Sequence, residues 1–254
     1  MPATDQDFSF ARDADFAAEM AVVRSAQIYW NHQSIGGNLL NGLAQITQGV
    51  APLHMIEVGD GRVFDMPAGG VLAHSLGGHN GQPAGKIEAF ENTLDTGLGF
   101  EPRLAMMKLC FVDFDASTDV DGLFARYAEM VARVRQRHPL TKIVHITTPL
   151  QVQETGWKAQ IKGWTGLKDF TAKANIQRNR YNELMRKRFA KDPMFDLARL
   201  ESTWPDGHRE TFSRSGASYE SLVPLYASDG AHLNAYGQRH IARQWVHAMA
   251  TALR

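Results

Sequence analysis

A carboxylate and an imidazole lie three positions apart near the end of the chain, where residues 228–234 read Ser-Asp-Gly-Ala-His-Leu-Asn. At this spacing the carboxylate of Asp229 can accept a hydrogen bond from one ring nitrogen of His232, which leaves the other nitrogen free to act as a base. A purely structural interpretation makes Asp229 the cap of the final helix, but Asn234 is better placed for that role. We therefore expect a catalytic pair, which needs a nucleophile from elsewhere in the chain.

The candidate nucleophile is Ser34, in the segment Asn-His-Gln-Ser-Ile-Gly-Gly-Asn at residues 31–38. It follows an expected strand and precedes an expected helix that begins near Ile35, so its hydroxyl should be exposed on a sharp turn. The free N–H groups and the positive dipole end of that helix would favour an oxyanion nearby, and Gly36 and Gly37 would let the backbone approach a ligand closely. Serine is also a favoured N-cap, and only its combination with the Asp-His pair makes catalysis the better interpretation.

Short apolar runs alternate with amphipathic helical segments along the chain, a pattern typical of βαβ units and a parallel sheet. The longest apolar run, 104–112, predicts a central strand that is covered on both faces. We expect one domain over residues 1–254, with a three-layer flavodoxin-like α/β fold and a parallel sheet of about five strands. The expected strands are 27–30, 54–58, 104–112, 142–146 and 194–197; the expected helices begin near Ile35, at a capping box of Thr118 and Asp121, near Ala172 and after Asn234.

Three stretches lack this periodicity: 59–85, which is rich in glycine, 151–168 and 204–225. In an open parallel sheet such loops gather at the carboxyl ends of the strands, where ligands bind. Trp157 and Trp164, in the second stretch, would form either an aromatic platform for a substrate or a lid packed on the core.

Charge and cysteine content limit the classes of partner. The chain has 27 basic and 27 acidic residues and no block of like charge, so neither a nucleic acid nor an anionic membrane surface is expected as a partner. The single cysteine, Cys110, lies in an apolar run and excludes an internal disulfide. No apolar run is long enough to span a bilayer, and residues 1–15 hold no apolar signal region. These features predict a cytoplasmic protein if the sequence is complete, and a periplasmic or secreted one if a signal peptide was removed.

The stretch Asp-x-x-His-Leu-Asn-x-x-Gly at residues 229–237 resembles the Asp-His block of the SGNH (GDSL-like) hydrolase superfamily. The serine after the first strand, the glycine-rich second region and the central third strand match the same pattern. His-Gln-Ser at residues 32–34 stands where the family usually has Gly-Asp-Ser, as in a divergent branch. The resemblance implies Ser34 as nucleophile, His232 as general base and acid, and Asp229 as the group that orients the histidine.

The family's oxyanion hole uses the N–H of the nucleophile, a glycine N–H and an asparagine side chain, so the resemblance implies Ser34 and Gly78 as backbone donors. The asparagine normally comes from a Gly-x-Asn-Asp motif after the third strand, which here reads Cys-Phe-Val-Asp at residues 110–113 and lacks it. Losing one such donor typically costs about two to three orders of magnitude in rate. We expect Asn80, in the glycine-rich region, to replace it, although a turn asparagine is the common alternative. Asp113 is expected to fix loops by hydrogen bonding.

The implied activity is that of a serine esterase, which hydrolyses carboxylic esters, often O-acetyl groups on carbohydrates, through a Ser-His-Asp triad. Two alternatives remain open: an O-acyltransferase that uses the same triad, and a non-catalytic carbohydrate-binding relative, which the missing asparagine favours. The expected partner is a small-molecule or carbohydrate ester, and no oligomeric state is predicted. No cofactor and no metal are expected, because His32, His74 and His79 lack metal-binding spacing.

Overall fold

The computed structural model describes residues 14–49, 51, 53–59, 69–153 and 167–254. Within them, six strands form one parallel sheet in the order β2-β3-β1-β4-β5-β6. These strands are β1 (Gln27–Asn31), β2 (Met55–Glu57), β3 (Val71–Ser75), β4 (Leu104–Met107), β5 (Lys142–Ile146) and β6 (Met194–Phe195). A separate antiparallel hairpin pairs β7 (Thr211–Arg214) with β8 (Ala217–Glu220).

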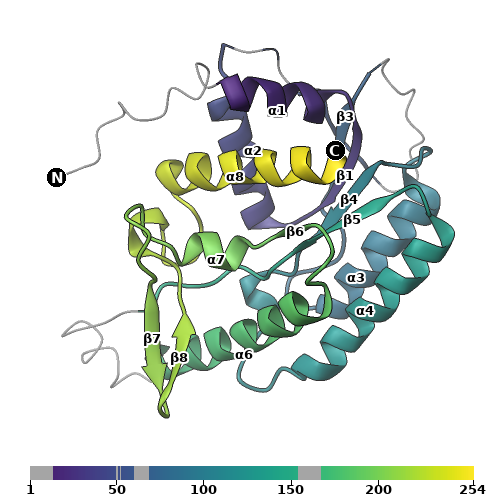
Figure 1. The fold of residues 1–254 in the computed structure, drawn as a ribbon. Coiled ribbons are helices and arrows are strands. Elements are labelled where there is room, and N and C mark those ends of the chain that lie inside the picture. The colour runs from purple at the N-terminus through teal and green to yellow at the C-terminus, as the bar shows by residue number, and fades with distance from the viewer. Residues whose placement is uncertain (1–13, 50, 52, 60–68, 154–166) are drawn as a thin grey trace.

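Helices cover both faces of the sheet, which confirms the expected three-layer α/β architecture (Figure 1). One face carries α1 (Ala14–Arg24), α2 (Ser34–Ile46) and α8 (Ala235–Leu253), and the other carries α3 (Pro83–Asn92), α4 (Val120–Arg137) and α6 (Leu167–Arg188). Shorter elements are α7 (Leu197–Glu201), a π-helical turn at Thr93–Gly97 and 3-10 turns at Phe111–Asp113 and Pro224–Tyr226. Among the described helices, none combines the length and apolar character that crossing a membrane requires.

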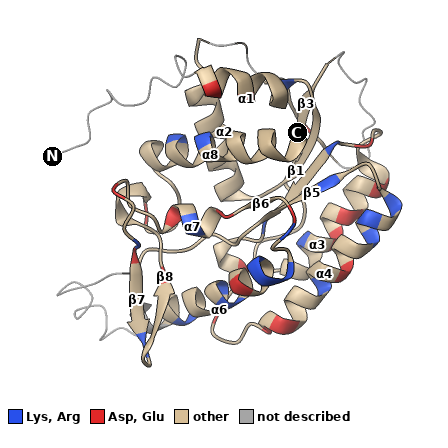
Figure 2. Ribbon diagram, viewed as in Figure 1, with Lys and Arg blue, Asp and Glu red and all other residues tan. Residues whose placement is uncertain are grey.

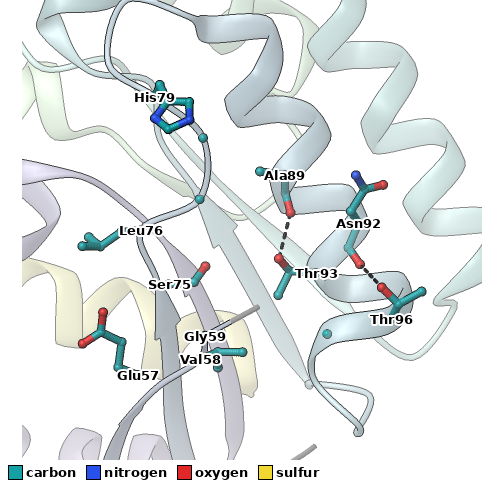
Figure 3. A pocket seen from close by; sticks show the side chains of 13 residues that line it. Glu57, Val58, Gly59, Ser75, Leu76, His79, Ala89, Asn92, Thr93 and Thr96 are labelled. Carbon is teal, nitrogen blue, oxygen red and sulfur yellow. Dashed lines mark hydrogen bonds between the residues drawn. The ribbon is translucent and has the colours of Figure 1, made fainter. Parts of the chain in front are cut away.

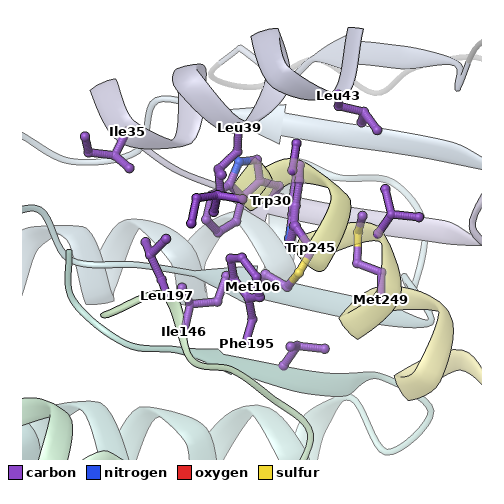
Figure 4. Packing of buried hydrophobic residues seen from close by; sticks show 14 of the residues in the cluster. Trp30, Ile35, Leu39, Leu43, Met106, Ile146, Phe195, Leu197, Trp245 and Met249 are labelled. Carbon is purple, nitrogen blue, oxygen red and sulfur yellow. The ribbon is translucent and has the colours of Figure 1, made fainter. Parts of the chain in front are cut away.

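Successive residues of the central strands point to opposite faces, so each strand contributes to two cores. Trp30 of β1 and Met106 of β4 lie in the core beneath α2 and α8, where the rings of Trp30 and Trp245 pack with centroids 5.4 Å apart (Figure 4). Tyr29 and Met107, each one position away, lie in the core beneath α3, α4 and α6. Because β1 and β4 are buried on both faces, residues 28–30 of β1 and all four residues of β4 are apolar or aromatic.

Several expected elements are confirmed closely. The strand expected at 142–146 is β5, and β1 extends the strand expected at 27–30 by one residue. Asn234 is the N-cap of α8, and its side-chain oxygen accepts a hydrogen bond of 2.9 Å from the N–H of Gly237.

Other expectations need correction. The strand expected at 104–112 is shorter, because β4 ends at Met107 and a 3-10 turn follows. The capping box of Thr118 and Asp121 is wrong: Asp119 caps α4, and its carboxylate accepts a 3.0 Å hydrogen bond from Gly122.

Two of the stretches without periodicity hold strands. β3 lies within the glycine-rich stretch 59–85, and this sixth strand adds one to the expected sheet. The β7–β8 hairpin lies within 204–225. Trp157 and Trp164 lie outside the described residues.

The topology places three loops together at one edge of the sheet. β1 lies between β3 and β4, so the loops that follow these three strands meet at their carboxyl ends. Ligands of open α/β sheets bind at such a point, where the strand order reverses. Ser34 follows β1 as the first residue of α2, Asn80 lies in the loop after β3, and Asp113 lies in the 3-10 turn after β4.

Charged side chains of both signs are interspersed along α4 (Figure 2). Arg133 and Arg137 of α4 pair with Glu91 of α3 at 2.7 Å and 2.6 Å, which ties the two helices together. The hydrogen bond from Arg133 is the main cause that lowers the pKa of Glu91 to about 2.

Candidate active site

Ser34 is the first residue of α2 and follows closely on β1. The N-cap position belongs to Gln33, whose side chain donates a 2.9 Å hydrogen bond to the carbonyl of Gly78 rather than capping the helix. Ser34 is exposed, and its hydroxyl forms no hydrogen bond with any described residue. The first N–H groups of a helix have no partners in the preceding turn. In α2 the N–H of Gly36 donates to the carbonyl of Gln33 at 2.7 Å, whereas those of Ser34 and Ile35 form no hydrogen bond with a described residue and are open to a ligand beside the serine. Ser34 therefore does not serve as the helix cap.

Asp229 and His232 form the hydrogen bond expected from their spacing, with Nδ1 of His232 2.7 Å from Oδ2 of Asp229. The other carboxylate oxygen accepts from the backbone N–H groups of Ala231 at 3.0 Å and of His232 at 2.8 Å. The bond from the backbone of His232 is the main cause that lowers the pKa of Asp229 to about 2. Because an ionised carboxylate can only accept, Nδ1 carries the proton and Nε2 is left to accept one.

The segment that holds His232 lies against the N-terminal half of α2. Oδ1 of Asn38, one helical turn beyond Ser34, accepts a 3.0 Å hydrogen bond from the N–H of Leu233, which is 195 positions away. The ring of His232 also packs edge-on against Phe111, with centroids 5.3 Å apart. Phe111 follows β4, the neighbour of β1, so His232 and Ser34 lie at the same edge of the sheet. The two side chains form no direct hydrogen bond with each other.

Two glycines allow the loop after β3 to pass close to its neighbours. Gly78 has a φ of +73°, and a Cβ there would lie 2.7 Å from Cα of Lys86, so only glycine fits without strain. A Cβ on Gly77 would lie 2.1 Å from Nδ2 of Asn31, the last residue of β1. The loop therefore packs directly on the end of the strand that leads to Ser34.

Asp113 holds the surrounding loops, as expected from its position. Its carboxylate accepts from the N–H of Gly81 at 2.9 Å and from the N–H of Cys110 at 2.6 Å. Lys86 donates to both of its oxygens, at 2.8 Å and 2.7 Å, and to Oδ1 of Asn80 at 2.9 Å. No motif in the sequence points to Lys86, because its partner Asp113 is 27 positions away.

His32 and His74 form a second polar group close to the serine. Nε2 of His32 is 3.3 Å from Nδ1 of His74, and the His32 ring stacks on Trp30. Burial lowers the pKa of His32 to about 4 and lowers that of His74 as well. His79 is exposed on the loop after β3. In the part of the chain that the structure describes, no three His, Cys, Asp or Glu side chains are grouped so that they could hold a metal ion.

Protonation of His32 should destabilise the folded protein in acid. Its imidazole stays neutral in the folded state down to a pKa of about 4, whereas in the unfolded chain it takes up a proton near the ordinary value of 6.5. The stability that the neutral ring contributes is therefore complete above about pH 6.5 and is lost as the pH falls toward 4. Between pH 7 and pH 4.5 the wild type should lose about 2 kcal/mol more unfolding free energy than His32→Gln, measured by urea denaturation at both pH values. An equal loss in the two proteins would contradict this assignment.

A pocket of about 530 Å³ opens beside the glycine loop, between the ends of β2 and β3 on one side and α3 on the other (Figure 3). Its volume lies in the range of small-molecule sites. Gly77 and Gly78 form part of its wall. The polar side chains that line it are Glu57, Ser75, His79, Asn92, Thr93 and Thr96.

No family model matches the sequence, and no curated protein matches it. Solved structures are similar in fold. A Streptococcus pneumonia protein provisionally described as a platelet activating factor is 12% identical with a TM-score of 0.52, over 95% of this chain and 92% of that chain. The acetyl xylan esterase AlAXEase is 14% identical with a TM-score of 0.47, over 87% and 98%. A peptidoglycan O-acetylesterase is 13% identical with a TM-score of 0.47, over 74% and 48%.

The first of these likenesses concerns the fold alone, and it covers nearly all of both chains. Together with the parallel sheet and its two helical layers, it shows that this chain shares the three-layer α/β fold of that protein. The three-layer α/β fold that the sequence predicts is therefore confirmed.

Proposed function

We propose that this protein is a serine esterase that hydrolyses carboxylic esters, with Ser34 as nucleophile, His232 as general base and acid, and Asp229 as the group that orients His232. The observation that carries the proposal is the 3.0 Å hydrogen bond between the N–H of Leu233 and the side chain of Asn38. This bond places His232, which Asp229 orients, beside the N-terminal end of α2, where Ser34 is exposed. A serine hydroxyl, an oriented base and free N–H groups are the parts that acyl transfer requires.

In the first half of the reaction, Nε2 of His232 takes the proton from Oγ of Ser34 as that oxygen attacks the ester carbonyl carbon. Hydrogen bonds between a nucleophile and its base often form only when substrate is bound, so their absence in the free protein is compatible with this step. The oxyanion accepts hydrogen bonds from the N–H of Ser34, the N–H of Gly78 and the side-chain amide of Asn80. The carbon–oxygen bond to the alcohol then breaks, the alcohol takes the proton from His232, and the acyl group stays on Ser34.

In the second half, a water molecule attacks the acyl group while His232 removes its proton. The bond to Ser34 breaks, the serine oxygen takes that proton back, and the free acid leaves. A sugar hydroxyl in place of the water would make the same residues an O-acyltransferase.

The pocket beside the glycine loop offers a place for the alcohol part of the ester. Its wall includes Gly78, one of the proposed oxyanion donors, and it continues over Asn92, Thr93 and Thr96. Hydroxyl, amide and carboxylate groups suit an alcohol that itself carries hydroxyls, so we include O-acetylated carbohydrates among the proposed substrates.

Product analysis tests this function and separates it from its alternatives. The protein is incubated with short aryl esters and acetylated sugars, with and without free glycans as acceptors. Hydrolysis predicts free acid equal to the ester consumed and unmodified glycans. Acylated glycan formed at the expense of free acid would replace the esterase with an acyltransferase. Saturable glycan binding without any ester consumption would favour a non-catalytic binding protein.

A further inference from the structure

We propose that Lys86 is a positioning residue: its ammonium group holds the side-chain oxygen of Asn80, so that the amide nitrogen is presented to the oxyanion as the third donor. The proposal rests on the proposed esterase function. It goes beyond that function by assigning a residue that no sequence motif identifies.

The chemistry of the contact decides which end of the Asn80 amide is held. An ammonium group has three donors and no acceptor, so the atom of Asn80 that lies 2.9 Å from Nζ of Lys86 is the oxygen. The nitrogen, at the other end of the amide group, forms no hydrogen bond with any residue that the structure describes, and Asn80 is exposed. An oxyanion site needs a donor that is fixed in place and still free to bond, and the Asn80 amide meets both conditions: its oxygen is bonded to Lys86 and its nitrogen has no described partner.

Lys86 is itself firmly anchored. Its side chain is 1% exposed and that of Asp113 is 0% exposed. Its Nζ donates to both oxygens of Asp113, at 2.8 Å and 2.7 Å. Asp113 also accepts a 2.9 Å hydrogen bond from the N–H of Gly81, the residue after Asn80. The ion pair therefore holds Asn80 both through its own side chain and through the adjoining backbone.

The loop that carries Asn80 crosses the end of the strand that leads to Ser34. It leaves β3 on one side of β1, and Gly81 is bonded to Asp113, which follows β4 on the other side. Between these points, the carbonyl of Gly78 accepts a 2.9 Å hydrogen bond from Gln33, the neighbour of Ser34. Asn80 is thus held over the same edge of the sheet as the serine.

The ion pair also removes an electrostatic obstacle. A lone carboxylate near a developing oxyanion would repel it, and the charge of Lys86 neutralises that of Asp113 at contact distance. The ammonium group of Lys86, 2.9 Å from the oxygen of Asn80, also polarises the Asn80 amide, which makes its N–H groups stronger donors.

The test measures ester hydrolysis by four proteins: wild type, Asn80→Ala, the double variant Lys86→Met/Asp113→Asn, and the triple variant that combines them. The double variant removes both charges together, because Lys86→Met alone would leave a buried carboxylate unpaired and could unfold the protein.

Asn80→Ala should lower kcat about 100- to 1000-fold and leave KM within about twofold. The double variant should lower kcat by about tenfold or more with the same small change in KM, because the amide is then no longer held in place. Adding Asn80→Ala to the double variant should cost at least about tenfold less than it costs in the wild type, since the two changes act on one group.

Arg133→Met is the matched control, because it removes an ion pair that also anchors α3, at Glu91, but does not touch the loop. It should lower thermal stability and leave kcat unchanged. This separates the positioning of Asn80 from a general weakening of α3.

A double variant with wild-type kcat, in which Asn80→Ala keeps its full effect, would overturn the proposal and leave the esterase function standing. A wild-type kcat in Asn80→Ala would also overturn the proposal, because it would show that the Asn80 amide does not bind the oxyanion. A wild type that turns over no ester contradicts the proposed function instead, and the contact is then tested by NMR relaxation of the Asn80 side-chain amide. That amide should be rigid in the wild type and mobile in the double variant, and equal mobility would overturn the proposal.

Discussion

Replacing Ser34 by alanine should lower kcat/KM for ester hydrolysis by about four orders of magnitude or more, because the variant has no oxygen to take up the acyl group. The fold should be unchanged, since the hydroxyl is exposed and unbonded to described residues and alanine is the best helix former. The measurement combines hydrolysis of an aryl ester with covalent labelling by a fluorophosphonate probe. The probe should label the wild type and fail to label the variant.

Ser213→Ala is the matched control for this prediction, because Ser213 is an exposed serine on β7. It should keep full activity and full labelling. Labelling of Ser34→Ala at the wild-type level would end the assignment of Ser34 as nucleophile. A folded wild type that is not labelled at all would favour the non-catalytic binding protein.

Replacing His232 by alanine should have an effect of similar size, about 10³- to 10⁶-fold in kcat, because Ser34 loses the acceptor for its proton and the alcohol loses its proton donor. Since the change leaves a space the size of the ring, imidazole added to the solution should restore part of the rate. The measurement is the hydrolysis rate of the variant against imidazole concentration, with the wild type measured in parallel.

The chain offers a close control in His208, whose Nδ1 lies 2.5 Å from Oδ1 of Asp206. This is a second aspartate–histidine pair, exposed and located between α7 and β7. His208→Ala should keep the wild-type rate and show no response to imidazole. An unchanged kcat in His232→Ala would show that His232 is not the general base, whatever the behaviour of the control.

Features that depend on neighbouring residues could be predicted from the sequence. The bond between Asp229 and His232 lies within a single turn of chain, and so does the capping of α8 by Asn234. The strand at 142–146 could be predicted because three of its five residues, Ile143, Val144 and Ile146, are apolar, as burial on both faces requires. In each case the hydrogen bond or the apolar pattern involves residues only a few positions apart in the sequence.

Features that depend on distant partners could not be predicted in this way. Val71–Ser75 is a short apolar segment preceded by two glycines, and it becomes a strand by pairing with β1 and β2. The capping box at Thr118 failed for the opposite reason, since several adjacent residues could cap α4 and Asp119 does so. Short local signals do not separate such alternatives.

The sequence by itself determined the residue types of the candidate site, the local pairing of Asp229 with His232, and the alternation of apolar and amphipathic segments that leads to a parallel α/β sheet. Only the tertiary structure decided which of these groups meet. The packing of α2 on α8 brings Asn38 to Leu233, and the ion pair between α3 and the turn after β4 brings together Lys86 and Asp113, which are 27 positions apart. Such contacts follow from how whole elements pack, and the distance between two residues along the chain carries no information about that.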